Sequence, residues 1–149
     1  MRGSRIYAAL FFYIHLHAVK IKIIYFLPAF IWFIIANFLF LMPGEDVPTW
    51  PFLDEIYFDK WVHCGLFFGL TFLTAFPFIK ALRLSKKLLI KISITFALYG
   101  VLIEFLQLYI AIDRDYDVLD MIADAIGCGI GFIAANWLWK RALQKNKPL

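Results

Sequence analysis

The sequence lacks the short motifs of common soluble enzymes and is poor in cysteine. It contains no GxSxG, P-loop or GxGxxG motif, so hydrolases and nucleotide-binding proteins of those types have no support. Its two cysteines, Cys64 and Cys128, form no CxxC pair and belong to apolar segments. We expect them to be small packing residues, with a disulfide between them left open. Strands that alternate polar and apolar residues are also missing, which argues against a transmembrane β-barrel.

Apolar residues dominate the composition. Hydrophobic residues make up 63% and aromatic residues 19% of the 149 positions, and the mean hydropathy is +0.78. A chain with this composition has too many hydrophobic side chains to bury them all in one small soluble core. The net charge of +4 does not indicate a nucleic-acid partner, because the basic residues flank apolar segments and form no stripe with stacking aromatics. The composition therefore predicts a membrane protein whose main partner is the lipid bilayer.

Four segments are long enough to cross a hydrocarbon core, which takes about 20 apolar residues in a helix. They cover about residues 21–42, 59–79, 88–112 and 120–139, and the first ends at Pro43-Gly44, a pair that stops helices. Helices are expected because lipid offers no hydrogen-bonding partner to an unpaired backbone amide. The sequence thus predicts an all-α, polytopic four-helix bundle as a transmembrane domain over residues 21–139.

Acidic and basic residues fall on opposite sides of these segments. The acids occur in two stretches: Glu45, Asp46, Asp54, Glu55 and Asp59, then Glu104, Asp113, Asp115, Asp117, Asp120 and Asp124. The bases precede the first span, separate the second from the third and follow the fourth, and only Lys60 and Arg114 lie among the acids. Because short basic loops stay in the cytoplasm, both termini are predicted to be cytoplasmic, with residues 140–149 as a basic tail. The acidic connections then face outward.

Residues 1–20 contain a further apolar run that is short for a crossing. The run covers about residues 6–19, includes His15 and His17, and has basic residues on both sides. A signal peptide is disfavoured because no A-x-A cleavage site follows. We interpret this segment as an interfacial or poorly ordered leader, and a re-entrant or fifth crossing is the alternative.

Polar residues in three spans are predicted to meet at one depth. With a rise of 1.5 Å per residue, His63, Glu104 and Asp124 each lie roughly 6 to 8 Å below the outer end of their helix. The fourth span carries a stripe at steps of three or four residues: Asp117, Asp120, Asp124, Gly127 and Gly131. Gly127 and Gly131 form a G-x-x-x-G pair, which is typical of close helix packing. Carboxylates in hydrocarbon persist only when they are paired or functional, so we predict a site here.

The candidate residues divide by role. The predicted binding residues are Asp59, Lys60, Gln107, Arg114, Asp117 and Asp120, and the catalytic residues of an enzyme would be His63, Glu104 and Asp124. Acids outnumber bases, so either some carboxylates hold protons or a cation completes the site. No cofactor or metal is predicted. A weaker variant places a divalent ion between Asp59, His63, Glu104 and Asp124, where oxygen ligands would suit Mg²⁺, Mn²⁺ or Ca²⁺.

The spacing of these polar residues resembles that of the VanZ-like family of small bacterial membrane proteins. The similarity covers residues 59–131 and rests on three motifs: Asp59-Lys60-x-x-His63, Glu104-x-x-Gln107 and Arg114-x-x-Asp117-x-x-Asp120-x-x-x-Asp124-x-x-Gly127-x-x-x-Gly131. The resemblance implies a helical bundle in the bacterial cytoplasmic membrane, in a family whose founding member is linked to resistance to the glycopeptide antibiotic teicoplanin. This chain departs from the pattern at Asp124, where the family usually has asparagine.

Several functions are compatible with such a cluster. The leading hypothesis is that it binds the head group of a lipid, a cell-wall precursor or a glycopeptide antibiotic, with Lys60 and Arg114 holding phosphate or carboxylate groups. An intramembrane enzyme acting on a phosphorylated lipid is the alternative, with His63 as general acid or base. A proton-coupled transporter, which would require a homo-oligomer, and a structural ionic lock are the remaining hypotheses.

Overall fold

The computed structural model of the protein describes residues 21–42, 52, 55–110 and 117–146. A short 3-10 helix, η1 (Ile23–Phe26), leads into α2 (Leu27–Phe40), and three longer helices follow: α4 (Phe58–Lys80), α5 (Lys86–Ile110) and α6 (Val118–Lys145). The described part of the chain contains no strand. Four segments are long and apolar enough to cross a membrane: Ile23–Phe40, Phe58–Lys80, Lys86–Tyr109 and Val118–Lys145. The predicted all-α four-helix architecture is therefore confirmed, and the protein is a multi-pass membrane protein.

Local side-chain caps explain where two of the helices begin. The Ser85 hydroxyl accepts a hydrogen bond from the Leu88 amide at 3.1 Å, just as α5 starts. Asp117 precedes α6 and accepts from the Leu119 amide at 2.7 Å. Both side chains satisfy amides that have no partner within the first turn of a helix.

Some predicted boundaries shift, and some predictions fall outside the described residues. Helix α6 continues to Lys145, six residues beyond the predicted end of the fourth span, so most of the basic segment after residue 139 is helical. No glycine or proline interrupts residues 132–145, which is why the helix continues. The leader at residues 1–20, the Pro43-Gly44 pair and Arg114 lie outside the residues that the structure describes.

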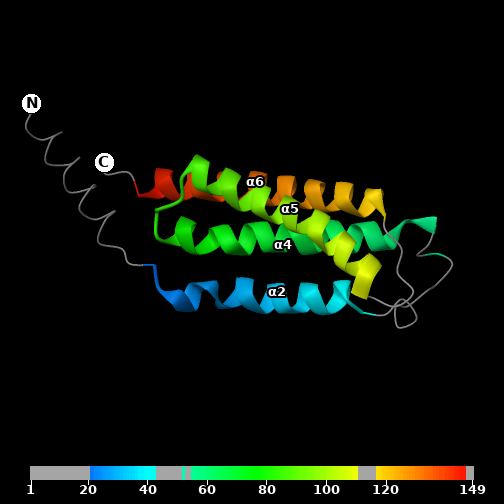
Figure 1. Ribbon diagram of the computed structural model, residues 1–149. Coiled ribbons are helices and arrows are strands. Elements are labelled where there is room, and N and C mark those ends of the chain that lie inside the picture. Colours follow the sequence, from blue (N-terminus) through cyan, green and yellow to red (C-terminus); the bar gives the residue numbers. More distant parts are fainter. Residues whose placement is uncertain (1–20, 43–51, 53–54, 111–116, 147–149) are drawn as a thin grey trace, which may run out of the picture.

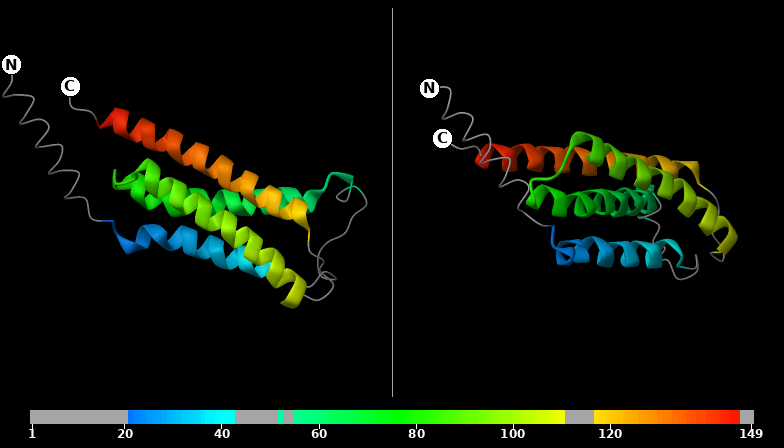
Figure 2. Two further views of the ribbon diagram at one scale, coloured as in Figure 1. Left: turned by 45° about the horizontal axis from the view of Figure 1, so that its top comes forward. Right: turned by 60° about the vertical axis from the view of Figure 1, so that its left-hand side comes forward.

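Helix α4 lies at the centre of the bundle, between α2 on one side and α6 on the other, and α5 crosses beside them (Figures 1 and 2). The contact between α4 and α6 is the most extensive of all the helix pairs. Helix α2 is joined to both α4 and α5, because Trp32 donates its indole N–H to the Leu66 carbonyl at 3.0 Å and the Tyr99 hydroxyl donates to Asn37 Oδ1 at 2.8 Å. The first span is thus an integral part of the bundle.

Two apolar clusters fill the interior, and many large apolar side chains point outward. One cluster is built around Phe40, Phe67, Leu70 and Ile103, and the other around Ala75, Ile79, Leu84, Leu89 and Ala135. Outward-facing side chains such as Phe38, Leu98 and Ile133 are each at least 65% exposed. Large exposed apolar faces on α2, α5 and α6 suit a lipid bilayer and would be costly in water.

Two glycines of α6 allow it to approach α4 closely. A Cβ atom at Gly127 would collide with the Cys64 carbonyl oxygen and lie 3.0 Å from the Phe68 amide nitrogen. A Cβ at Gly131 would lie 2.9 Å from the Phe68 carbonyl oxygen. Cys64 and Cys128 are free thiols, and Cys128 is buried in this contact region. The two backbones therefore meet without intervening side chains, as membrane helices with small residues do.

Charge separates along the bundle. The starts of α4 and α6 and the end of α5 lie at one end, at the right of Figure 1, whereas the start of α5 and the ends of α4 and α6 lie at the other. The described acids belong to the first end, which we call the acidic end, and the described bases other than Lys60 belong to the opposite, basic end. Such sidedness is what a fixed orientation in a membrane requires.

Replacing Gly127 with alanine should lower the free energy of unfolding by about 1–3 kcal/mol, because the added methyl overlaps the α4 backbone. The matched control is Gly129→Ala on the same helix, where nothing lies within 4 Å of the added Cβ. That variant should be neutral or up to about 1 kcal/mol more stable, since alanine favours the helix. SDS titration of the protein in mixed micelles, followed by circular dichroism, measures both. Equal stability of the two variants would contradict the close contact of α4 with α6.

Candidate functional site

Three helices place their polar side chains together at the acidic end, and we call this group the ionic cluster. Its members are Asp59, Lys60 and His63 from α4, Glu104 from α5, and Asp117, Asp120 and Asp124 from the start of α6. Helical spacing explains the grouping, because residues three or four apart share one face of a helix. The structure thus brings together seven of the residues that the sequence singled out.

Lys60 is the centre of the outer part of the cluster. Its Nζ atom lies 2.9 Å from Asp59 Oδ2, 2.5 Å from Asp117 Oδ2 and 2.9 Å from Asp120 Oδ1. An ammonium group has three hydrogens to donate, so these carboxylates use all of them. Lys60 is therefore committed to acids of its own chain, which leaves it no donor for the phosphate or carboxylate group that the sequence assigned to it.

Asp117 joins the outer part of the cluster to the inner part. One of its oxygens accepts from Lys60 and the other from the Leu119 amide, while its own backbone amide donates to Glu104 Oε2 at 3.1 Å. The hydrogen bond from Lys60 lowers the pKa of the Asp117 carboxyl below its usual range. Asp117 therefore stays ionised and ties the start of α6 to both α4 and α5.

His63 is the centre of the inner part. Its Nδ1 atom lies 3.0 Å from Asp124 Oδ1 and 4.0 Å from Glu104 Oε1, and its Nε2 atom lies 4.0 Å from Asp120 Oδ2. The imidazole is 4% exposed, and Glu104 and Asp124 are fully buried. The Phe40 ring packs on the imidazole with 4.9 Å between ring centres. A buried His–Asp pair with two further carboxylates near it is an arrangement that can hold or transfer a proton.

Two carboxylate oxygens in the inner part have no hydrogen-bond partner among the described residues. They are Glu104 Oε1 and Asp124 Oδ2, and both are completely buried. An unsatisfied buried oxygen costs about 1–3 kcal/mol, and more when it is charged. Asp124 Oδ2 packs against Gly100 of α5, where a Cβ would lie only 2.6 Å away. The free oxygen of Glu104 instead faces the imidazole, and so it faces the middle of the cluster.

Sequence reasoning missed Gly100 and Phe40 as neighbours of the site. Gly100 stands four residues before Glu104, on the same face of α5, so its spacing was a usable signal. Phe40 belongs to another helix and carried no such signal. Gln107, which the sequence assigned to binding, is buried and donates its amide to the Phe40 carbonyl at 2.9 Å. It therefore caps the end of α2 and draws that helix against α5.

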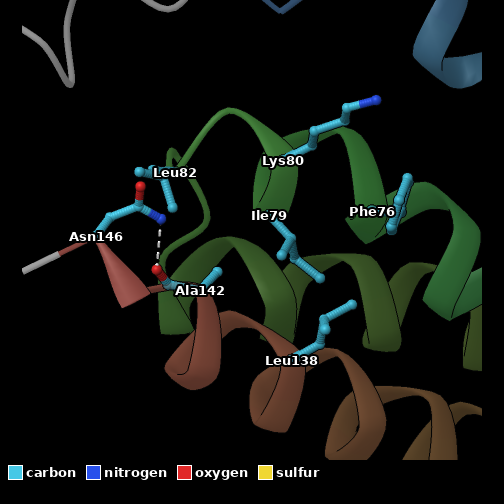
Figure 3. A pocket seen from close by; sticks show the side chains of 7 residues that line it. All are labelled: Phe76, Ile79, Lys80, Leu82, Leu138, Ala142 and Asn146. Carbon is cyan, nitrogen blue, oxygen red and sulfur yellow. Dashed lines mark hydrogen bonds between the residues drawn. The ribbon is translucent and has the colours of Figure 1, made fainter. Parts of the chain in front are cut away.

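Two of the hollows that the described residues form lie at opposite ends of α4. The first, of about 490 Å³, is an apolar groove between α4 and α6 at the acidic end; its lining residues are Ile56, Tyr57, Lys60, Trp61, Cys64, Leu119, Ile122, Ala123 and Ile126. The second, of about 400 Å³, lies at the basic end, where Asn146 bonds back to the Ala142 carbonyl at 2.8 Å (Figure 3). Only the first groove includes a member of the ionic cluster, so it is the one connected with the site.

The cluster carries an excess of negative charge. Five carboxylates, those of Asp59, Glu104, Asp117, Asp120 and Asp124, surround one ammonium and one imidazole. Buried like charges repel strongly, and the membrane offers no water to screen them. The described residues therefore form a site that attracts protons or a cation.

The chain was compared with models of protein families, with curated proteins and with solved structures. No match was found in any of the three comparisons.

Replacing Lys60 with methionine should lower the free energy of unfolding at neutral pH by about 1–3 kcal/mol. The change leaves Asp117 and Asp120 without their counter-charge, and the effect is smaller than for a fully buried pair because the Lys60 side chain is 17% exposed. The pKa of Asp117 is lower in the folded protein than in the unfolded chain. Asp117 therefore contributes stability at pH values above the ordinary aspartate pKa, and this contribution is lost as the pH falls through the pKa of the folded state. Because the Lys60→Met variant has lost this interaction, its stability should fall less than that of the wild type as the pH is lowered through this range.

Thermal unfolding in detergent between pH 3 and pH 8 measures this effect. Lys140→Met is the matched control, since Lys140 is an exposed lysine at the basic end. A Lys60→Met protein that is as stable as the control would show that the three ion pairs contribute little to the bundle.

Proposed function

We propose that this protein is a multi-pass protein of the bacterial cytoplasmic membrane that binds the head group of a membrane amphiphile at its ionic cluster. The observation that carries the proposal is that Lys60 is saturated by three carboxylates of its own chain. Among the described residues, the cluster therefore has no free ammonium for an anion but has carboxylates in excess. We infer that the ligand presents a positive group, such as a primary ammonium, to this end of the bundle.

Two carboxylates at the rim are placed to receive that ammonium. The side chains of Asp59 and Asp117 are 50% and 39% exposed, whereas Glu104 and Asp124 are buried. Hydrogen bonds between an ammonium and a carboxylate contribute about 1.5–3 kcal/mol, and more when lipid excludes water. The rim can thus select an amine-bearing head group over a neutral one.

The apolar groove beside Lys60 supports an amphiphilic ligand. Its lining combines Lys60 at one end with side chains such as Trp61, Ile122 and Ile126. A volume of about 490 Å³ is within the range of small-molecule sites, and here it opens between two helices that face lipid. We propose that an acyl or prenyl chain lies in this groove while its head group meets the rim.

The orientation and the ligand class follow from the charge pattern and the family resemblance. The basic end belongs in the cytoplasm by the positive-inside rule, which directs the ionic cluster outward and places both termini inside. The resemblance to the VanZ-like family favours a lipid, a cell-wall precursor or a glycopeptide antibiotic as the ligand. Of these, the excess of carboxylates favours a member that carries an amine.

A second candidate function is an intramembrane enzyme that acts on a phosphorylated lipid. The 3.0 Å contact between His63 Nδ1 and Asp124 Oδ1 favours it, because an ionised aspartate there holds the proton on Nδ1 and leaves the lone pair on Nε2. His63 would then act as general base, with Glu104 or Asp124 assisting it.

Filling the groove should weaken ligand binding. Ile122 lines the groove and is 50% exposed, so Ile122→Trp should occupy the space of the acyl chain and reduce affinity at least tenfold. The matched control is Ile133→Trp, on the same helix, 67% exposed and outside the groove. The probe is fluorescent phosphatidylethanolamine in detergent micelles. Fluorescent phosphatidylglycerol, which lacks the amine, is the comparison probe.

Wild-type protein should prefer the amine-bearing probe, and Asp59→Asn should reduce that preference about tenfold or more. Teicoplanin added as a competitor tests whether the antibiotic uses the same site. Equal affinity for both probes, or unchanged binding by Ile122→Trp, would overturn the proposal.

The enzyme candidate makes a separate prediction at Asp124. Asp124→Asn retains an oxygen that can accept from His63 but removes the charge that stabilises a protonated imidazole, so kcat should fall about a hundredfold or more. Release of inorganic phosphate from a lipid phosphate in detergent is the measurement. Head-group binding should be unchanged in this variant. Equal phosphate release by wild type and Asp124→Asn would exclude catalysis by this pair.

A further inference from the structure

Three residues of the ionic cluster share an arrangement in which one side-chain atom is bound by the protein and another has no hydrogen bond to a described residue. Glu104 uses Oε2 to accept from the Asp117 amide, Asp120 uses Oδ1 to accept from Lys60, and His63 uses Nδ1 to contact Asp124. Within the described part of the chain, the atoms without such a hydrogen bond are Glu104 Oε1, Asp120 Oδ2 and His63 Nε2. Each side chain is thus oriented by one partner and has one donor atom to offer a ligand.

We propose that His63, Glu104 and Asp120 form a binding site for a divalent transition-metal ion such as Zn²⁺ or Mn²⁺. One ligand atom from each residue lies within 4.8 Å of the other two. The three residues come from α4, α5 and α6, and they are 4%, 0% and 8% exposed. A metal bound at about 2.0–2.2 Å from each atom would draw the three helices together with only small side-chain movements.

The free oxygen of Glu104 is a second indication of a ligand, separate from the excess of negative charge in the cluster. Oε1 is completely buried, has no hydrogen-bond partner among the described residues, and lies 4.0 Å from His63 Nδ1. Buried polar atoms are satisfied in the great majority of cases, so an orphaned carboxylate oxygen inside a membrane bundle calls for a partner. A metal ion between His63, Glu104 and Asp120 supplies one.

The other group of acids is not available to a metal. Asp59, Asp117 and Asp120 also bring oxygen atoms within 4.8 Å of one another. The Lys60 ammonium already occupies their centre, with Nζ 2.5–2.9 Å from all three. A metal there would have to displace a lysine or sit beside its positive charge. The proposed ion therefore takes the His63 side of the cluster, and Asp120 belongs to both halves.

The donor set indicates which ions fit. One imidazole nitrogen and two carboxylates suit Zn²⁺ or Mn²⁺, whereas Mg²⁺ and Ca²⁺ prefer oxygen alone. Asp124 would orient the ring through Nδ1, which is the usual role of a carboxylate behind a metal-bound histidine. This set differs from the one that the sequence indicated, because Asp59 is engaged by Lys60 and Asp124 contacts the opposite nitrogen of the ring.

A metal at this position does not depend on the proposed head-group binding. Two positive charges would relieve most of the repulsion among the buried carboxylates, and the exposed Asp59 and Asp117 at the rim would still attract an ammonium. The metal site includes neither Asp59 nor Asp117. Metal binding can therefore be tested with the metal alone, in the absence of any lipid probe.

The experiment uses the full chain in detergent micelles, stripped of metal by a chelator and then titrated with ZnCl₂ or MnCl₂ in a calorimeter. We expect one ion per chain, and a drop in affinity of about tenfold to a hundredfold or more in Glu104→Gln and in His63→Gln. Glu55→Gln is the matched control, because it removes an exposed acid that lies outside the ionic cluster and leaves all three ligands in place. It should bind with less than a threefold change, roughly 0.6 kcal/mol.

Two further measurements keep the result decisive. His15→Gln combined with His17→Gln removes the histidines of the leader, and this variant should bind as the wild type does. Pulsed electron paramagnetic resonance of bound Mn²⁺ should detect nitrogen coupling from His63 in wild type, and this coupling should be absent from His63→Gln. Circular dichroism confirms that each variant is folded. Failure of the wild type to bind, or equal binding by the Glu104, His63 and Glu55 variants, would overturn the proposal, whatever the lipid experiments show.

Discussion

The cost of placing carboxylates inside a membrane bundle is the constraint on which the acidic end of this structure depends. Charged groups in hydrocarbon are tolerated only when partners compensate them, and here the partners come from different helices. Lys60 of α4 holds Asp117 and Asp120 at the start of α6, and the Asp117 amide binds Glu104 of α5. The same contacts that make the acids tolerable therefore fasten three helices together.

Close helix packing makes those contacts geometrically available. Gly127 lets α6 lie directly on the α4 backbone near Cys64, one residue after His63, and Gly100 leaves room for the Asp124 carboxylate between α5 and α6. A Cβ at Gly127 would overlap the α4 backbone and one at Gly100 would overlap the Asp124 side chain, so either the helices or that side chain would have to shift. Small residues and buried acids thus act as one unit, because the glycines set the distance at which the acids and His63 interact.

The functional consequence is a division of the cluster into two halves with different properties. Around Lys60 three carboxylates share one ammonium and two of them are partly exposed, which suits recognition of a positively charged head group at the membrane surface. Around His63 the carboxylates are buried and incompletely hydrogen-bonded. Buried carboxylate oxygens that lack hydrogen-bond partners favour the binding of a cation or a proton. The inner half is therefore where metal binding or proton transfer would take place.

The sequence by itself determined the four spans, the all-α class and the separation of charge, because hydrophobic length and the flanking bases are local properties. It also indicated that His63, Glu104 and the aspartates share one level, since helical rise converts residue number into depth. It did not reveal that Lys60 would be consumed by acids of its own chain, that Gln107 would cap α2, or that Phe40 would cover His63. Those contacts depend on the rotation of each helix about its axis and on which helices are neighbours. Only tertiary packing decides these, because many rotations bury similar apolar area and few also pair the buried charges.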